Sequence, residues 1–264
     1  MGLFDFFKKK ETEQENKSES IFLAMPLFRG GAGFNPSAVA EDLRNHWGLN
    51  VTTTEGGDNN TEVFTIDGAM VGLTHIPMPI PGDELSECAK LAYNWDTAME
   101  DLKDYTSHGV VFVKAKNATA LEQAILLSKT LASILRTSEA VGIYQGSQSL
   151  LISKDQYLSG AEELKEGGLP IQLWVYLGLR KSEAGNSIYT YGLANFGKKE
   201  MEVVKSALSL EELYSFITNI CSYVIGHDVT FKHGETLGYT EDQKVKITVS
   251  KGHFLEGQTL KLEM

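Results

Sequence analysis

The sequence predicts an α+β protein with mixed, largely antiparallel sheets packed against helices. Segments of strand length, either apolar throughout or alternating between apolar and polar residues, are separated by helix-like segments along the chain. Several of the helix-like segments begin with residues that cap a helix. The pair Asp67-Gly68 lies between two strand-like segments and favours a two-residue antiparallel hairpin, because both turn positions require positive φ.

In the first half of the chain, helices are expected to begin at Asn35, Asp83 and Thr119. Asn35 precedes a proline, which suits the first helical position, and Thr119 forms a capping box with Glu122. The helix that begins at Asp83 is expected to carry a continuous apolar stripe that includes Met99. The strands expected in this half are 21–28, 51–54, 63–66, 69–74 and 109–115.

The second half of the chain repeats this mixture. A helix is expected over 209–225, opened by the capping box of Ser209 and Glu212, and another around 155–165. The strands expected here are 171–180, 187–193, 200–204, 244–250 and 259–263. Because both halves run through several strands, a capped helix and more strand, we expect two related sheet-and-helix units.

This organisation predicts a flexible N-terminal tail over residues 1–20, an N-terminal α+β unit over 21–145 and a C-terminal α+β unit over 146–264. The alternative is that these two units form one continuous domain. No residue-level repeat of fixed period relates them.

The composition predicts a soluble protein of a reducing compartment. Hydrophobic residues make up 42% of the chain and charged residues 22%, as in ordinary globular proteins. Both cysteines, Cys88 and Cys221, fall inside apolar helix-like patterns, so we expect no disulfide framework and a cytoplasmic location. No apolar run reaches the roughly 18 residues that a transmembrane helix needs.

The chain has a formal charge of −11, from 24 basic and 35 acidic residues. This charge repels phosphate backbones, so we expect no nucleic-acid partner, and it favours a basic protein. Three acidic clusters could contribute to a binding face for such a protein or could be solvated helix surfaces. They are Glu100, Asp101 and Asp104; Glu162, Glu163 and Glu166; and Glu211 and Glu212.

The first ten residues combine apolar and basic side chains. Leu3, Phe4, Phe6 and Phe7 stand beside three consecutive lysines. This is not the pattern of a signal peptide, because Asp5 interrupts the apolar part and no cationic region precedes it. The segment predicts either weak docking to a membrane surface or a partner, or a frayed terminus partly covered by the domain.

The sequence contains no complete catalytic or metal-binding constellation. The six histidines form no HxxxH or HExxH pair, and neither a GxSxG elbow nor a cysteine with a plausible base is present. We therefore expect no catalytic residue, no metal and no cofactor. One pocket candidate remains, because His75 and His108 lie at the ends of predicted strands and could meet near Trp95. They could instead satisfy local backbone groups.

Glycine, proline and aromatic landmarks follow one another in a recognisable order. In the first half, Pro77-Met78-Pro79-Ile80-Pro81 precedes Trp95 and His108. The landmarks of the second half are Thr190-Tyr191-Gly192-Leu193, Phe196-Gly197-Lys198 and Gly234-Glu235-Thr236-Leu237-Gly238. Over nearly all of the chain after the tail, this order resembles DUF4261, a bacterial family of unknown function. The resemblance implies a cytosolic protein without known catalytic residues, in a family some of whose members have been suggested to be immunity proteins of toxin systems.

Two functions remain open on these grounds. The leading hypothesis is a non-catalytic protein-binding module, such as an immunity-type protein that covers a basic toxin with an acidic surface. The alternative is a small-ligand-binding protein or an enzyme with a pocket near His75, His108 and Trp95. The first hypothesis predicts a concentrated acidic face, and the second predicts that both histidines line one concavity.

Overall fold

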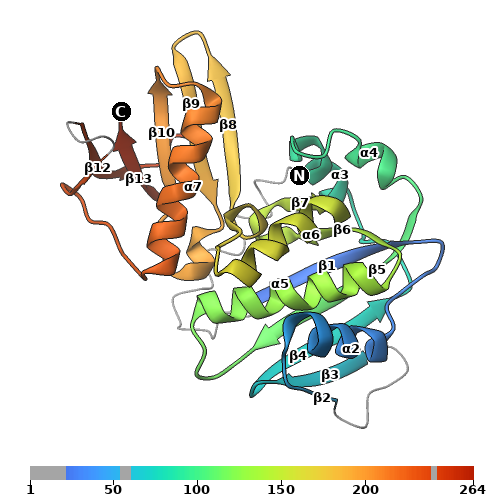
Figure 1. The fold of residues 1–264 in the computed structure, drawn as a ribbon. Helices are drawn as coiled ribbons and strands as arrows, with labels where there is room; N and C mark the ends of the chain where they lie inside the picture. The colour runs from blue at the N-terminus through green and yellow to red at the C-terminus, as the bar shows by residue number, and fades with distance from the viewer. Residues whose placement is uncertain (1–21, 54–60, 239–242) are drawn as a thin grey trace. The chain divides into compact units, whose positions relative to one another are not determined.

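The computed structural model describes residues 22–53, 61–238 and 243–264. The chain divides into two compact units, Met1–Gly168 and Leu169–Met264, each built on one open sheet (Figure 1). The described residues form six α-helices and thirteen strands, which confirms the expected α+β class. The boundary expected at residues 145 and 146 falls between two strands that pair with each other in the first sheet.

The first unit contains a seven-stranded sheet with the order β2-β3-β4-β5-β1-β6-β7. Its neighbouring strands are all antiparallel. The expected hairpin at Asp67-Gly68 is confirmed, with φ of 49° and 86° at its two turn residues. The strands are β1 (Phe22–Arg29), β2 (Val51–Thr53), β3 (Thr61–Ile66), β4 (Ala69–Ile76), β5 (Tyr105–Lys114), β6 (Ala140–Gln145) and β7 (Leu150–Ser153).

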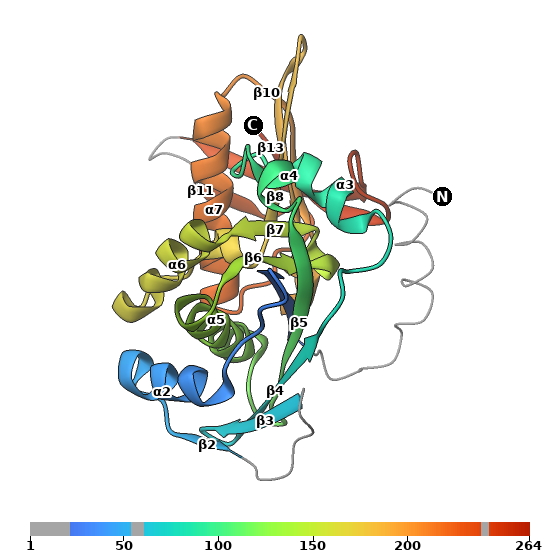
Figure 2. The ribbon, with the colours of Figure 1, turned by 90° about the vertical axis from the view of Figure 1, so that its right-hand side faces the viewer.

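Helices α2 (Pro36–Trp47), α5 (Ala120–Thr137) and α6 (Lys154–Glu162) cover one face of this sheet (Figure 2). We call it face 1. The expected N-terminal caps are present: the side chain of Asn35 accepts a hydrogen bond from the N–H of Ala38, and Thr119 and Glu122 form a reciprocal capping box. The apolar faces of these helices bury Phe28 and other residues that point to face 1.

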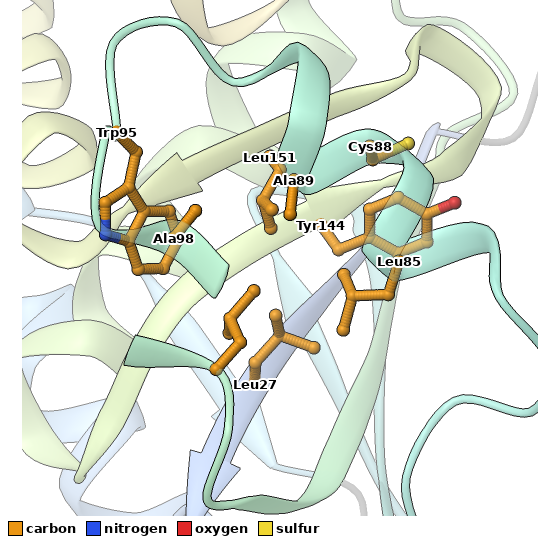
Figure 3. Packing of buried hydrophobic residues seen from close by; sticks show 9 residues of the cluster. Leu27, Leu85, Cys88, Ala89, Trp95, Ala98, Tyr144 and Leu151 are labelled. Atoms are coloured by element: carbon orange, nitrogen blue, oxygen red, sulfur yellow. The ribbon is translucent and has the colours of Figure 1, made fainter. Parts of the chain in front are cut away.

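The opposite face, face 2, is covered near β1, β6 and β7 by α3 (Glu84–Leu91) and α4 (Ala98–Asp101). These helices contribute to a buried apolar cluster, shown in Figure 3 with Trp95 and Ala98 at one end and Tyr144, Cys88 and Leu85 at the other. The cluster consists of Leu27, Leu85, Cys88, Ala89, Trp95, Ala98, Leu102, Tyr144 and Leu151.

The single continuous helix expected from Asp83 was wrong, because the chain breaks into two short helices around residues 92–97. Asp83 precedes α3 but makes no side-chain capping hydrogen bond. In the break, the carboxylate of Asp101 accepts hydrogen bonds from Trp95 Nε1 at 2.7 Å and Thr97 Oγ1 at 2.6 Å. Such local side-chain hydrogen bonds compete with helix continuation, and they outweighed the helical spacing of the apolar residues.

The second unit contains a six-stranded sheet with the order β11-β12-β13-β10-β9-β8. Only the pairing of β10 with β13 is parallel among its described neighbours. Helix α7 (Leu210–Gly226) packs on one face of the sheet, and it begins with the expected capping box of Ser209 and Glu212. The strands are β8 (Tyr176–Ser182), β9 (Gly185–Tyr191), β10 (Met201–Ser206), β11 (Thr236–Gly238), β12 (Lys244–Lys251) and β13 (Gln258–Glu263).

Two glutamates separated by one residue, Glu200 and Glu202, have pKa values shifted in opposite directions in this unit. Burial raises the pKa of Glu200, although the Thr190 hydroxyl and the backbone N–H groups of Gly192 and Ala194 donate hydrogen bonds to its carboxylate. Burial also disfavours the charged form of Glu202, but the ammonium group of Lys261, 2.6 Å away, outweighs it together with two backbone N–H groups, so its pKa is lowered. Glu202 is therefore a buried, paired carboxylate in the middle of the sheet.

We expect the substitution Lys261→Met to lower the free energy of unfolding by about 3 kcal/mol, because it leaves the Glu202 carboxylate buried without its cation. Denaturation by urea, followed by circular dichroism, measures this change. The matched control is Lys246→Met, since Lys246 lies 3.8 Å from Glu263 and both side chains are largely exposed. The control should cost less than about 1 kcal/mol, and an equal loss in the two variants would contradict the assignment.

The lowered pKa of Glu202 also predicts a pH dependence. A carboxyl group whose pKa in the folded protein is below its usual 4.5 stabilises the fold fully above that usual value and loses this contribution as the pH falls through the folded-state pKa. The difference in unfolding free energy between wild type and Glu202→Gln should therefore be largest near neutral pH and shrink below pH 4.5. Urea titrations over a pH series measure it, and a difference that grew on acidification would refute the sign.

Candidate interaction surface

The strand register separates the two histidines of the pocket candidate. Paired residues of antiparallel strands lie on the same face, and successive residues of one strand alternate between faces. Gly109 pairs with His75, and its neighbour His108 pairs with Ile76, so the two imidazoles lie on opposite faces of the first sheet. The structure thus places these side chains apart, and it does not give them a shared concavity.

His75 lies on face 1, and its ring packs edge-on against Phe28 and Phe34, with ring centroids 5.8 and 6.5 Å apart. His108 is buried on face 2, where its Nδ1 lies 2.8 Å from the carbonyl oxygen of Met78. Both histidines are therefore built into the packing at the end of the sheet next to residues 77–104.

Trp95 shares face 2 with His108, but its role in the structure is to anchor residues 77–104 on the sheet. The indole ring lies directly over Gly142, where a Cβ atom would be 2.8 Å from the ring. Its Nε1 donates to Asp101, whose backbone carbonyl in turn accepts a hydrogen bond from Arg29 Nε at 3.1 Å. Trp95 is thereby held to β6 through its ring and to β1 through Asp101.

Residues 77–104 form a long connection between β4 and β5, which we call the insert. Antiparallel neighbours need a loop of only about two to five residues, and longer connections in compact domains usually carry a function. The insert has seven acidic side chains and two lysines, a formal charge of −5. The seven are Asp83, Glu84, Glu87, Asp96, Glu100, Asp101 and Asp104.

The insert also exposes large apolar side chains. Met78, Tyr93 and Met99 are 54%, 41% and 53% exposed, and they are three of the six most exposed large apolar residues in the described part of the chain. They come from the loop before α3, the loop after it and α4. Because the inner side of the insert covers the buried cluster on face 2, these three residues are not needed to complete that core.

The three acidic clusters predicted from the sequence differ in their surroundings. Glu162 is neutralised, because its carboxylate lies 2.9 Å from His46, 2.6 Å from Lys165 and 3.4 Å from Arg136. The carboxylate of Asp101 accepts hydrogen bonds from Thr97 and Trp95 and lies beside Arg29, and these three groups lower its pKa. In the same cluster Glu100 and Asp104 are exposed, so the insert retains charges that face solvent.

The third cluster borders a groove in the second unit. Glu211 and Glu212 lie at one end of an open groove of about 590 Å³ along α7, and the exposed ring of Tyr223 lies at the other. Glu212 also closes the capping box of this helix. The second unit has ten basic and eleven acidic residues, so its charges nearly balance. The acidic excess of the chain belongs to the first unit.

The sequence patterns do not predict that the apolar residues of the insert are exposed. Met99 was assigned to the core-facing stripe of a continuous helix, and it is exposed because that helix breaks before residue 98. Two features of the sequence do point to an exposed segment. The insert is longer than a hairpin needs, and it combines proline, methionine and carboxylates. Leu3, Phe4, Phe6 and Phe7, the apolar residues of the predicted N-terminal docking segment, lie outside the described residues.

Among residues 22–53, 61–238 and 243–264, no group of three or more His, Cys, Asp or Glu side chains is arranged to hold a metal ion. Over the same ranges, none of the helices has the length and apolar character to cross a membrane.

A family model described as a domain of unknown function, DUF4261, matches residues 189–263. This segment belongs to the DUF4261 family. The DUF4261 segment includes the second-half landmarks, the buried Glu202 and the groove along α7, whereas Trp95, His108 and the insert lie outside the match. Comparisons with curated proteins and with solved structures found no significant match.

We expect both cysteines to be unreactive in the folded protein. Burial raises the pKa of Cys88 to about 11 and raises that of Cys221 as well. At pH 8 only about one Cys88 thiol in a thousand would be ionised, and the thiolate is the reactive form. Iodoacetamide at pH 8 should therefore modify neither cysteine, while both should react in guanidinium. Rapid labelling of the native protein at either position, detected by mass spectrometry, would contradict this.

Proposed function

We propose that this chain is a non-catalytic protein-binding module whose insert binds a basic segment with apolar anchors on a partner protein. One observation carries the proposal: Met78, Tyr93 and Met99 are exposed within a segment that has a formal charge of −5. Scattered exposed apolar residues are ordinary on protein surfaces, but three large ones in one acidic connection are typical of an interaction site.

The chemistry of these side chains suits a partner of that kind. Methionine is flexible and polarisable, so it adapts to apolar side chains of different shapes, and tyrosine is enriched among residues that dominate binding energy. The surrounding carboxylates would attract lysine and arginine before contact and would select against acidic partners. The packing of Trp95 against Gly142 restricts the insert, which would reduce the entropy that binding costs.

An immunity-type role is one form of this proposal. The partner would then be a basic toxin in the bacterial cytoplasm, and the insert would cover the surface with which the toxin acts. Coexpression with the product of a neighbouring toxic gene tests this form: rescue of growth should depend on the insert residues. The alternative of a ligand pocket at His75, His108 and Trp95 is not favoured, because the register separates the two histidines.

A synthetic amphipathic peptide of leucine and lysine serves as the probe for the general proposal. We expect it to bind the full chain, with affinity that weakens as salt is added. Tyr93→Ser and Glu100→Lys should each weaken binding, the first by about tenfold because it removes an aromatic anchor. Isothermal titration calorimetry measures these affinities. A matched peptide with glutamate in place of lysine should not bind.

Matched substitutions outside the insert distinguish binding at the insert from nonspecific binding elsewhere on the protein. Tyr223→Ser removes a comparably exposed tyrosine in the other unit, and Glu41→Lys makes the same charge change on an exposed glutamate of α2, which packs on face 1 of the first unit. Both controls should leave the affinity within about twofold of wild type, since neither residue belongs to the insert. If controls and insert variants lost affinity equally, the insert would not be the binding site.

A further inference from the structure

We propose that the first ten residues of this same chain, Met1–Lys10, occupy the insert and compete with its partner. The inference rests on the function proposed for the insert and adds its regulation. In this arrangement the partner-binding surface is covered intramolecularly by a segment with the chemistry of the partner, and a partner must displace that segment to bind.

The composition of Met1–Lys10 complements the insert. Leu3, Phe4, Phe6 and Phe7 supply four large apolar side chains, and residues 8–10 supply three adjacent lysines. The insert offers the matching groups, with exposed methionine and tyrosine side chains among carboxylates. Apolar anchors next to lysines are the features that an acidic surface with exposed Met and Tyr recognises.

The tether between the two is long enough. Residues 11–21 separate the basic segment from the start of β1, and eleven residues can span up to about 36–40 Å. Strand β1 has eight residues and is therefore roughly 25 Å long. At its far end Arg29 contacts the insert, with Nη2 lying 3.5 Å from Asp101 Oδ1. Residues 11–21 can therefore span more than the length of β1, which is the distance from the start of this strand to the insert contact at Arg29.

Because Met1–Lys10 is covalently tethered to the insert, even a weak affinity between the two is enough to keep the insert occupied. A short tether gives an effective concentration in the millimolar range, so an affinity of about 0.1–1 mM would fill the surface for half of the time or more. The apparent affinity of a partner is reduced by the fraction of molecules that remain open. Removal of the segment should therefore raise partner affinity by about two- to tenfold.

The first experiment compares three proteins: the full chain, a deletion of residues 1–10, and the triple variant Phe4→Ser, Phe6→Ser and Phe7→Ser. The leucine and lysine peptide is the probe, and calorimetry gives its affinity. We expect it to bind the deletion and the triple variant two- to tenfold more tightly than the full chain. Equal binding to all three would overturn self-occupancy and leave the binding function standing.

The second experiment needs no partner or probe. A carbodiimide joins lysine and carboxylate side chains that touch, and mass spectrometry of the monomer locates the links. We expect links from Lys8, Lys9 or Lys10 to Asp96, Glu100 or Asp104, and we expect the triple serine variant to lose them. Links confined to Glu41 on α2 or to other sites outside the insert would overturn the proposal.

The two experiments distinguish failure of the proposed binding function from failure of the proposed intramolecular contact. If the probe bound none of the three proteins while the links to the insert formed, the function proposed for the insert would be lost and the intramolecular contact would stand. The alternative is that Met1–Lys10 binds a membrane surface, and vesicles of phosphatidylcholine and phosphatidylserine test it. Phe-dependent binding of the full chain to vesicles, with no link to the insert, would show that the segment binds lipid and would overturn self-occupancy.

Discussion

The contact between the Trp95 ring and the bare backbone of Gly142 is the constraint on which the surface of the first unit depends. A Cβ atom at residue 142 would lie 2.8 Å from the indole and 2.6 Å from the carbonyl oxygen of Ile152, so the ring requires a residue without a side chain beneath it. This contact holds the insert against face 2 and completes the buried cluster there.

The insert consequently has two chemically different sides. Its inner side supplies Leu85, Cys88 and Ala98 to an apolar core, where burial raises the pKa of the Cys88 thiol. Its outer side carries methionine, tyrosine and carboxylates. Asp101 links the two, because one carboxylate binds Trp95 and Thr97 while the backbone of the same residue binds Arg29 of β1. These contacts restrict the conformations of the insert, and a restricted surface loses less entropy in any binding event.

Local chemistry made part of this fold predictable. The hairpin at Asp67-Gly68 and the capping boxes of Thr119 and Ser209 depend on residues close in sequence, and each occurs where it was expected. The break at residues 92–97 was not predictable from apolar spacing, because it depends on hydrogen bonds to Asp101 and on a glycine in a distant strand. The separation of His75 from His108 likewise depends on register, which a one-residue shift would reverse.

The strand orders of the two sheets have a consequence for synthesis of the chain. In the first unit the earliest described strand, β1, lies between β5 and β6, so it must wait for partners that are made long after it. In the second unit the last strand, β13, lies between β12 and β10 and joins them. That sheet therefore stays divided until residues 258–263 have left the ribosome, while the first unit can already be closed. Chaperones that protect unpaired strand edges would meet the two units at different moments of translation.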